Sequence, residues 1–201
     1  MIIAPQNPKR SPIRYAVDNG AYYCWTRKLE WDELKFRKML DRVDTFDRRP
    51  DFGVVPDIVA GGMASLEFSL SWVGRLPAGY PWYLAVQDGM GEADVQPVLR
   101  QFGGIFVGGT SEWKMRSLPI WARAAKQNGK KLHVGRVNSL QRAFVVAQVF
   151  RADSFDGTNW NRLWNNVKKP ARVNLDSAQG SLDLYGIHRL EEGGPRAQHQ
   201  G

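Results

Sequence analysis

The stretch WYLAVQDGMGEADVQPVLRQFGGIFVGG, residues 82–109, contains the pattern from which the fold class follows. Its two ends, 82–87 and 104–109, are short runs rich in aliphatic and aromatic residues, each ending in a polar residue or glycine, so both are predicted strands. The residues between them, 92–102, fit a helix. A strand, a helix and a strand in this order predict parallel pairing through a right-handed crossover.

The same alternation continues on both sides of this stretch. Further strands are predicted at 14–18, 52–58, 132–137 and 153–155, with another in MIIAP at the start. Further helices are predicted at 30–43, 63–76, 112–128 and 139–152, with Pro119 early in its helix. Two α/β architectures are open, a doubly wound sheet and a (β/α)8 TIM-like barrel. Such barrels typically need about 250 residues, so a barrel of this chain would be compact, with one element reduced.

Charge and cysteine content narrow the class of protein. The net charge of +8 and the pI of about 9.8 favour an anionic partner, of which nucleic acid is the commonest, although surplus charge can also serve solubility alone. Cys24 is the only cysteine, which excludes an intrachain disulfide and a zinc site of several cysteines. Together with an N-terminus that lacks a signal-peptide pattern, this favours the cytoplasm, or the host cytoplasm for a phage protein.

Domain organisation is predicted to be simple. Residues 1–190 are expected to form one catalytic domain, and 191–201, which have no apolar pattern, a disordered tail. No apolar run approaches the length of about 20 residues that spans a bilayer, so no membrane association is expected.

Polar residues follow most of the predicted strands. Because the carboxyl ends of parallel strands form one edge where active sites lie, these residues are expected to converge; they are Asp18, Asp57, Gln87, Gly108, Gly109 and Asp156. Each also has a structural interpretation as a turn or capping residue. Clustered carboxylates suit either a hard metal such as Mg²⁺ or glycosidic chemistry, in which one attacks an anomeric carbon and another moves a proton.

The ordered motifs VDNGAYY, VVPDIV, LAVQDG, GIFVGGT, LHVGRV and DSFDGTNWNR resemble those of the tRNA-guanine transglycosylase (queuine tRNA-ribosyltransferase) superfamily. The likeness covers residues 14–162 and is greatest to phage and bacterial enzymes that insert 7-deazaguanine bases into DNA. It implies a TIM-like barrel and a glycosyltransferase that replaces guanine with a base such as 7-cyano-7-deazaguanine. DNA is then the expected partner, ahead of tRNA, and no metal or cofactor is expected.

The resemblance also implies a role for each matching residue. Asp156 falls on the nucleophilic aspartate, and Asp18 on an aspartate active in proton transfer. The other matches imply substrate binding: Tyr22 by stacking, Asp57 and Gln87 by reading the base edge, and Gly108, Gly109 and Gly135 by close backbone approach. Two departures stand out: DNGAY replaces the family's Asp-Ser-Gly-Gly-Phe, and the zinc subdomain of the tRNA-acting members is missing.

Other functions remain open at this point. They are a transglycosylase acting on RNA, a nucleic-acid-binding barrel without catalysis, and a metal-dependent nuclease or phosphatase that uses the carboxylates. Asp153 is interpreted as structural, and His133, His188 and His199 as too scattered for a metal site. A homodimer or an accessory protein is compatible with the sequence.

Overall fold

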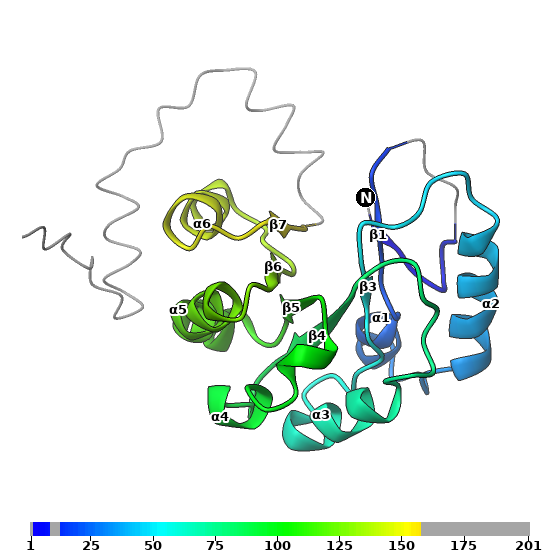
Figure 1. Cartoon of the computed structure of the whole chain (residues 1–201), viewed down its shortest axis with the longest axis horizontal. Coiled ribbons are helices and arrows are strands. Elements are labelled where there is room, and N and C mark those ends of the chain that lie inside the picture. The colour runs from blue at the N-terminus through cyan, green and yellow to red at the C-terminus, as the bar shows by residue number, and fades with distance from the viewer. Residues whose placement is uncertain (1, 9–12, 158–201) are drawn as a thin grey trace, which may run out of the picture.

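A computed structural model describes residues 2–8 and 13–157 of the chain. Its seven strands are all parallel, and their order in the sheet equals their order in the sequence. The sheet curls into an open half-barrel (Figure 1). The strands are β1 (Ile2–Ile3), β2 (Ala16–Val17), β3 (Gly53–Val54), β4 (Trp82–Val86), β5 (Gly104–Val107), β6 (Lys131–Val134) and β7 (Ser154–Phe155).

Helices connect the strands and lie mainly around the outside of the curled sheet (Figure 1). They are α1 (Ala21–Thr26), α2 (Glu33–Asp44), α3 (Gly62–Ser71), α4 (Glu92–Val95), α5 (Ser111–Gln127) and α6 (Leu140–Phe144), with a 3₁₀ turn, η1 (Leu99–Gln101), and a π turn, η2 (Val145–Val149). In the described part of the chain, no helix is both long enough and apolar enough to cross a bilayer.

The α/β prediction is confirmed, but the closed (β/α)8 barrel is not. Within the described residues β1 and β7 do not pair with each other, so they form the two edges of an open sheet. The strand order never reverses, which a doubly wound sheet would require. The predicted domain limit at residue 190 lies outside the described residues.

Proline explains two differences from the predicted elements. The strand expected over 52–58 is reduced to Gly53–Val54, because Pro56 has no N–H for the strand ladder. The helix expected over 92–102 is split into α4 and η1 around Pro97, which has no N–H to donate to the carbonyl four residues earlier. Pro119, expected near the start of its helix, is instead in the middle of α5.

The sheet has a large core outside and a small one inside the curl. The outer core is built by alternate strand residues such as Val17, Leu84 and Val107 packed against the helices. Inside the curl, Phe52 stacks on Tyr83 with ring centroids 4.2 Å apart. Because strand side chains alternate between faces, the same two-residue period fills both cores.

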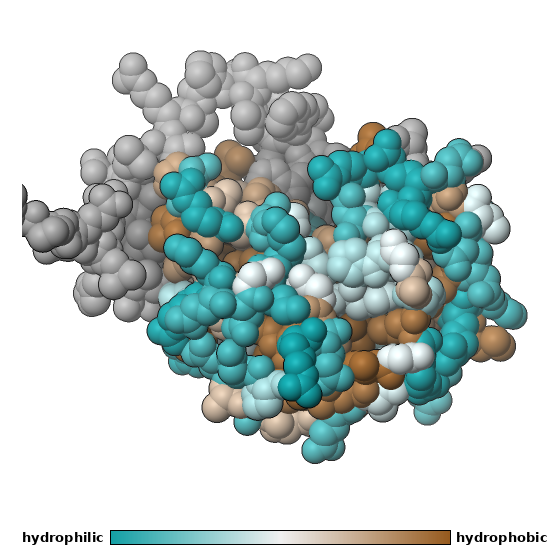
Figure 2. Space-filling model, in the orientation of Figure 1, coloured by the Kyte–Doolittle hydropathy of each residue, from teal (hydrophilic) through white to brown (hydrophobic). Residues whose placement is uncertain are grey.

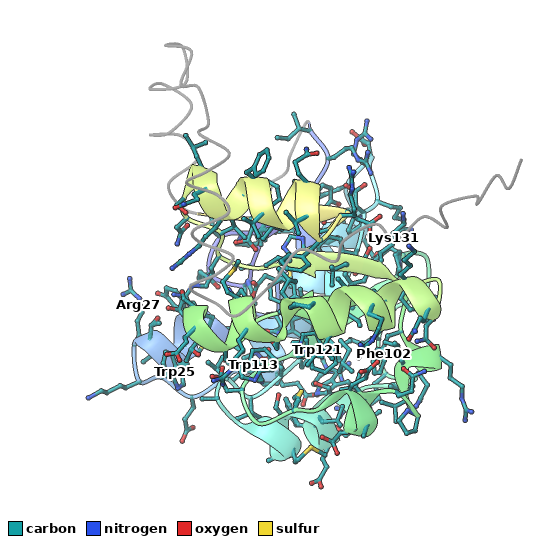
Figure 3. All side chains as sticks on the ribbon, turned by 90° about the vertical axis from the view of Figure 1, so that its left-hand side faces the viewer. Trp25, Arg27, Phe102, Trp113, Trp121 and Lys131 are labelled. Atoms are coloured by element: carbon teal, nitrogen blue, oxygen red, sulfur yellow. The ribbon has the colours of Figure 1, made fainter. Side chains whose placement is uncertain are left out.

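The two ends of the sheet differ. Figure 3 views the molecule side-on: Lys131, which begins β6, lies at one end, and Trp25 of α1 lies at the other, the end at which α5 also begins with Trp113 near its start. The latter is therefore the carboxyl end of the strands. The opposite, amino-end face is shown in Figure 2; it is mostly hydrophilic, with hydrophobic residues showing mainly in its lower part.

Candidate active site at the carboxyl ends of the strands

The polar residues predicted to converge lie at the carboxyl end of the sheet. Asp18 directly follows β2, Gln87 directly follows β4, and Asp156 directly follows β7. They belong to two groups of side chains. We call Asp18, Asn19, Asp57, Ser65 and Gln87 the Asp57 cluster, and Lys114, His133, Gly135, Arg136 and Asp156 the Asp156 cluster.

Asn19 is the hub of the Asp57 cluster, and its role was not predicted from the sequence. The side chain is 2% exposed, and its Nδ2 donates to Val55 O and to Asp57 Oδ1, both at 2.7 Å. Its Oδ1 accepts from the backbone N–H of Ala21 at 2.7 Å, at the start of α1. Asn19 thus joins the ends of β2 and β3 and orients the Asp57 carboxyl group. Its only sequence signal is its place beside Asp18, and Asn before Gly reads as an ordinary turn residue.

Gln87 fixes the other side of Asp57. Its Nε2 lies 3.3 Å from Asp57 Oδ2, 2.8 Å from Ile58 O and 2.7 Å from Ser65 Oγ. Its Oε1 accepts from the backbone N–H of Ala60 at 2.6 Å. Both ends of the amide therefore have protein partners, and the side chain is 2% exposed. The contact of Gln87 with a base edge stays a prediction, whereas its contact with Asp57 is an observed one.

The Asp57 cluster raises the pKa of both its carboxyl groups. Burial raises the pKa of Asp57 to about 6, and the negative charge of Asp18 adds to this, partly offset by the hydrogen bonds from Asn19 and Gln87. Burial likewise raises the pKa of Asp18; the Gly20 N–H, which donates to Asp18 Oδ1 at 2.6 Å, opposes the shift, and the charge of Asp156 adds to it. Two groups that can carry a proton closer to neutral pH than an ordinary aspartic acid are thus placed side by side.

Asp156 has the opposite environment. Burial alone would raise its pKa, but the hydrogen bond and charge of His133, the Arg136 N–H and the charge of Lys114 together hold that pKa below its usual value. His133 Nε2 lies 3.0 Å from Asp156 Oδ2, and the Arg136 N–H donates to Oδ1 at 2.9 Å. Because an ionised carboxylate only accepts, His133 Nε2 carries the proton of this bond.

His133 is itself held in place. Its Nδ1 lies 2.8 Å from Ser154 Oγ, and its ring stacks on Phe106, with centroids 4.9 Å apart and planes at 16°. The sequence analysis discarded His133 because no other histidine lies near it. The missed signal was pairing between neighbouring strands: His133 of β6 is in register with Ser154 of β7, two residues before Asp156.

Lys114 is the second residue that the sequence analysis missed. It is 4% exposed, and its Nζ donates to Gly135 O. Burial and, to a smaller extent, the charge of Arg136 lower its pKa to about 8, while the charge of Asp156 opposes the shift. The available signal was its position: Lys114 shares the buried face of α5 with Leu118 and Trp121, where a lysine is unusual.

The two clusters meet across the end of the sheet. Asp18 and Asp156 are close enough for the charge of Asp156 to raise the pKa of Asp18. The Arg136 guanidinium lies over the Tyr22 ring, 4.1 Å from its centroid. The structure therefore brings the predicted residues Asp18, Tyr22, Asp57 and Asp156 together at one end of the sheet.

The predicted glycines have close protein neighbours. A Cβ on Gly135 would lie 2.7 Å from Phe106 Cζ, and one on Gly109 would lie 2.4 Å from Asp88 Oδ2. Gly109 also has φ of +75°, whereas Gly108 has ordinary contacts and no positive φ. Packing thus accounts for Gly109 and Gly135, and their approach to a bound base stays a prediction.

The candidate site contains no evident metal-binding group. Across residues 2–8 and 13–157, no three His, Cys, Asp or Glu side chains are arranged to hold one metal ion together. His188 and His199 lie outside the described residues.

The fold and the site define a class: a parallel α/β half-barrel with three carboxylates in contrasting environments at the carboxyl end of its strands. Comparison with family models, curated proteins and solved structures finds no match to this chain. The likeness to transglycosylases therefore rests on the sequence motifs.

Proposed function

We propose that this protein is a base-exchange transglycosylase that replaces guanine in DNA with a 7-deazaguanine base through a covalent aspartyl-glycosyl intermediate. The observation that carries the proposal is the contrast among the three carboxyl groups. The pKa of Asp156 is held low, while those of Asp18 and Asp57 are raised. Carboxyl groups whose pKa values are driven apart suit the roles of nucleophile and proton carrier.

In the first half of the reaction, the Asp156 carboxylate attacks C1′ of a deoxyguanosine. A carboxylate–C1′ bond forms, the glycosidic C–N bond breaks, and its electron pair leaves with guanine, which takes a proton from Asp18. His133 and the Arg136 N–H hold Asp156 in its ionised form and fix its orientation. In the second half, Asp18 removes a proton from the incoming base, whose nitrogen attacks C1′ and releases the Asp156 carboxylate.

Base recognition is assigned to the Asp57 cluster and Tyr22. Asp57, oriented by Asn19 and Gln87, accepts hydrogen bonds from the Watson–Crick edge of a guanine-like base. Tyr22 offers for stacking the face of its ring that the Arg136 guanidinium does not cover. A buried polar site of this kind rejects bases that lack matching groups, because its own groups would then be left unpaired.

The target base must leave the duplex to reach this site. Flipping costs a few kcal/mol, and stacking together with phosphate contacts offsets that cost. The net charge of +8 supports binding to the phosphate backbone.

The test is base exchange on duplex DNA with labelled guanine or 7-cyano-7-deazaguanine, in the presence of a metal chelator. We expect incorporation by the wild type and a loss of more than about 10³-fold in Asp156→Ala, because the nucleophile is removed. The wild type should also form a protein–DNA adduct that survives denaturation. Asp153→Asn is the matched control, because the Asp153 carboxylate accepts from the Leu132 N–H at 2.9 Å and from Lys131 Nζ at 2.6 Å, at the start of β6 and away from the carboxyl end.

The alternatives give different results in the same assay. Incorporation that survives in Asp156→Ala would disprove the assigned nucleophile. Exchange on tRNA but not on DNA would favour the RNA enzyme, and chelator-sensitive strand cleavage would favour the nuclease. Binding of DNA without any exchange would leave only the nucleic-acid-binding barrel.

A further inference from the structure

A ladder of stacked side chains leads from the candidate nucleophile to the surface. At its inner end is Arg136, whose backbone N–H contacts Asp156 and whose guanidinium covers Tyr22 at 4.1 Å. At its outer end is Trp25, whose ring centroid lies 5.9 Å from that of Tyr22, with planes at 33°. We define Arg136, Tyr22 and Trp25 as the stacking ladder.

The outer end of the ladder is exposed. Trp25 is 54% exposed and Tyr22 37%, although tryptophan is highly buried on average. Figure 3 shows Trp25 and Arg27 at the carboxyl end of the sheet. Neither aromatic residue belongs to a described core cluster, so core packing does not explain them.

Positive charge accompanies these exposed rings. Arg27 lies over the Tyr23 ring at 4.6 Å from its centroid, and Lys28 follows it as an exposed residue. Arg136 is also exposed and adds a third positive charge at the inner end. Exposed aromatic rings interleaved with cations are typical of surfaces on which unpaired bases stack while their phosphates are neutralised.

We propose that the stacking ladder binds the unpaired DNA nucleotide next to the target, with its base on Trp25 and its phosphate near Arg136. The choice of DNA as the occupant rests on the proposed function and on the positive charge of this surface. In this arrangement the ladder holds the opened strand while the target base occupies the site between the two clusters. Trp25 then determines strand binding, without touching the reacting atoms.

The test measures binding of a fluorescent single-stranded oligo(dT) of about 12 nucleotides by anisotropy, with the full chain. Trp25→Ala should weaken binding about tenfold, the effect of losing one base–aromatic stack. Trp25→Phe should stay within about threefold because it keeps a ring, whereas Trp25→Leu should resemble Trp25→Ala. Arg136→Gln should make the dependence of log K on log salt less steep, by the amount expected for the loss of about one phosphate contact.

Leu34→Ala is the matched control, because Leu34 is 61% exposed on α2 and lies outside the ladder. The proposal is overturned if Trp25→Ala binds like the wild type, if Trp25→Leu binds like Trp25→Phe, or if Leu34→Ala weakens binding equally. A preference for oligo(rU) that depends on Trp25 would overturn the assignment to DNA. Base exchange is measured separately. If the wild type exchanges bases but Trp25→Ala binds the oligonucleotide as tightly as the wild type, only the stacking ladder is refuted. If binding depends on Trp25 but the wild type shows no exchange, only the proposed function is refuted.

Discussion

At the scale of single residues, the site shows how the same side chain acquires opposite properties. Asp57 and Asp156 both follow strands and are partly buried. Burial raises the pKa of Asp57, whereas for Asp156 the hydrogen bonds and positive charges together outweigh burial and lower the pKa. The difference depends on partners, chiefly His133 for Asp156 and the nearby negative Asp18 for Asp57. Two experiments separate these causes.

His133→Phe tests the donor to Asp156. Phenylalanine keeps a ring against Phe106 but removes the hydrogen bond, so burial should then raise the pKa of Asp156. Because exchange needs the ionised carboxylate, the acidic limb of the pH–rate profile should move to higher pH. The loss of rate relative to wild type should therefore be greater at acidic than at neutral pH. The profile is measured from acid to neutral pH, with His133→Gln as the variant that retains a donor; an unchanged acidic limb in His133→Phe would contradict this role.

Asp57 should make stability depend on pH. Its folded pKa, about 6, lies above the ordinary value of 3.8, so the folded state binds a proton more tightly than the unfolded state. Its contribution to stability is therefore present at low pH and is lost as pH rises from about 4 to 7. Asp57→Asn cannot lose a proton, so its free energy of unfolding relative to wild type should increase by about 1–2 kcal/mol over that interval, after solvent screening. Urea unfolding at several pH values measures this difference, and a constant difference would refute it.

At the scale of elements, the connection from β5 to α5 is held by Asp88. Asp88 accepts from the backbone N–H and the hydroxyl of Thr110, both at 2.7 Å, and Thr110 in turn caps α5 by accepting from the Trp113 N–H. Gly109 lies under this contact with φ of +75°. The loop that follows β5 is thus tied to the end of the central strand, β4.

Gly109→Ala should disrupt this connection. A Cβ at this position would lie 2.4 Å from Asp88 Oδ2. The alanine would also have to adopt a positive φ, which is unfavourable for a residue with a side chain. We expect a loss of about 2–3 kcal/mol in the free energy of unfolding. Gly129→Ala is the control: φ is +61°, but nothing lies within 4 Å of the added atom, so only backbone strain of about 1 kcal/mol applies. Equal losses in the two variants, measured by thermal or urea unfolding, would show that the Asp88 contact is unimportant.

At the scale of the whole molecule, an open sheet still makes a convergent site. Seven parallel strands in sequential order curl far enough for Asp18 after β2 and Asp156 after β7 to interact electrostatically. Closure of the barrel is therefore not required for this convergence. The curl brings the two halves of the site together, and it leaves α1 at the carboxyl end, where the stacking ladder reaches the surface.

The charge of the whole molecule gives a further expectation. With a net charge of +8, duplex DNA binding should weaken by roughly 10²- to 10³-fold between 50 and 200 mM salt, as for several neutralised phosphates. Anisotropy titrations on duplexes of different sequence measure the slope, which should be the same for each because phosphate contacts carry no sequence information. A flat salt dependence would contradict a phosphate-binding surface.

Much of the fold could be predicted because its signals are local. Short apolar runs separated by amphipathic stretches predicted seven parallel strands near their observed positions. Because the carboxyl ends of parallel strands lie at one edge of the sheet, the sequence also predicted that Asp18, Asp57 and Asp156 lie at that edge. The lengths of the strands and the closure of the barrel could not be predicted, because proline and the pairing with neighbouring strands determine where the hydrogen bonds of each strand end. Helix α1 was also missed, since six residues after a turn carry too weak a periodic pattern.

The sequence by itself determined the α/β alternation, the positive charge and the edge at which the carboxylates lie, since each depends on nearby residues or on composition. Only the tertiary structure decided which carboxyl groups have a raised pKa and which has a lowered one. That outcome depends on partners far away in the chain: Asn19 reaches Asp57 across 38 residues, and His133 reaches Asp156 across 23. Desolvation and hydrogen bonding act through space, so the open half-barrel had to form before these aspartates differed.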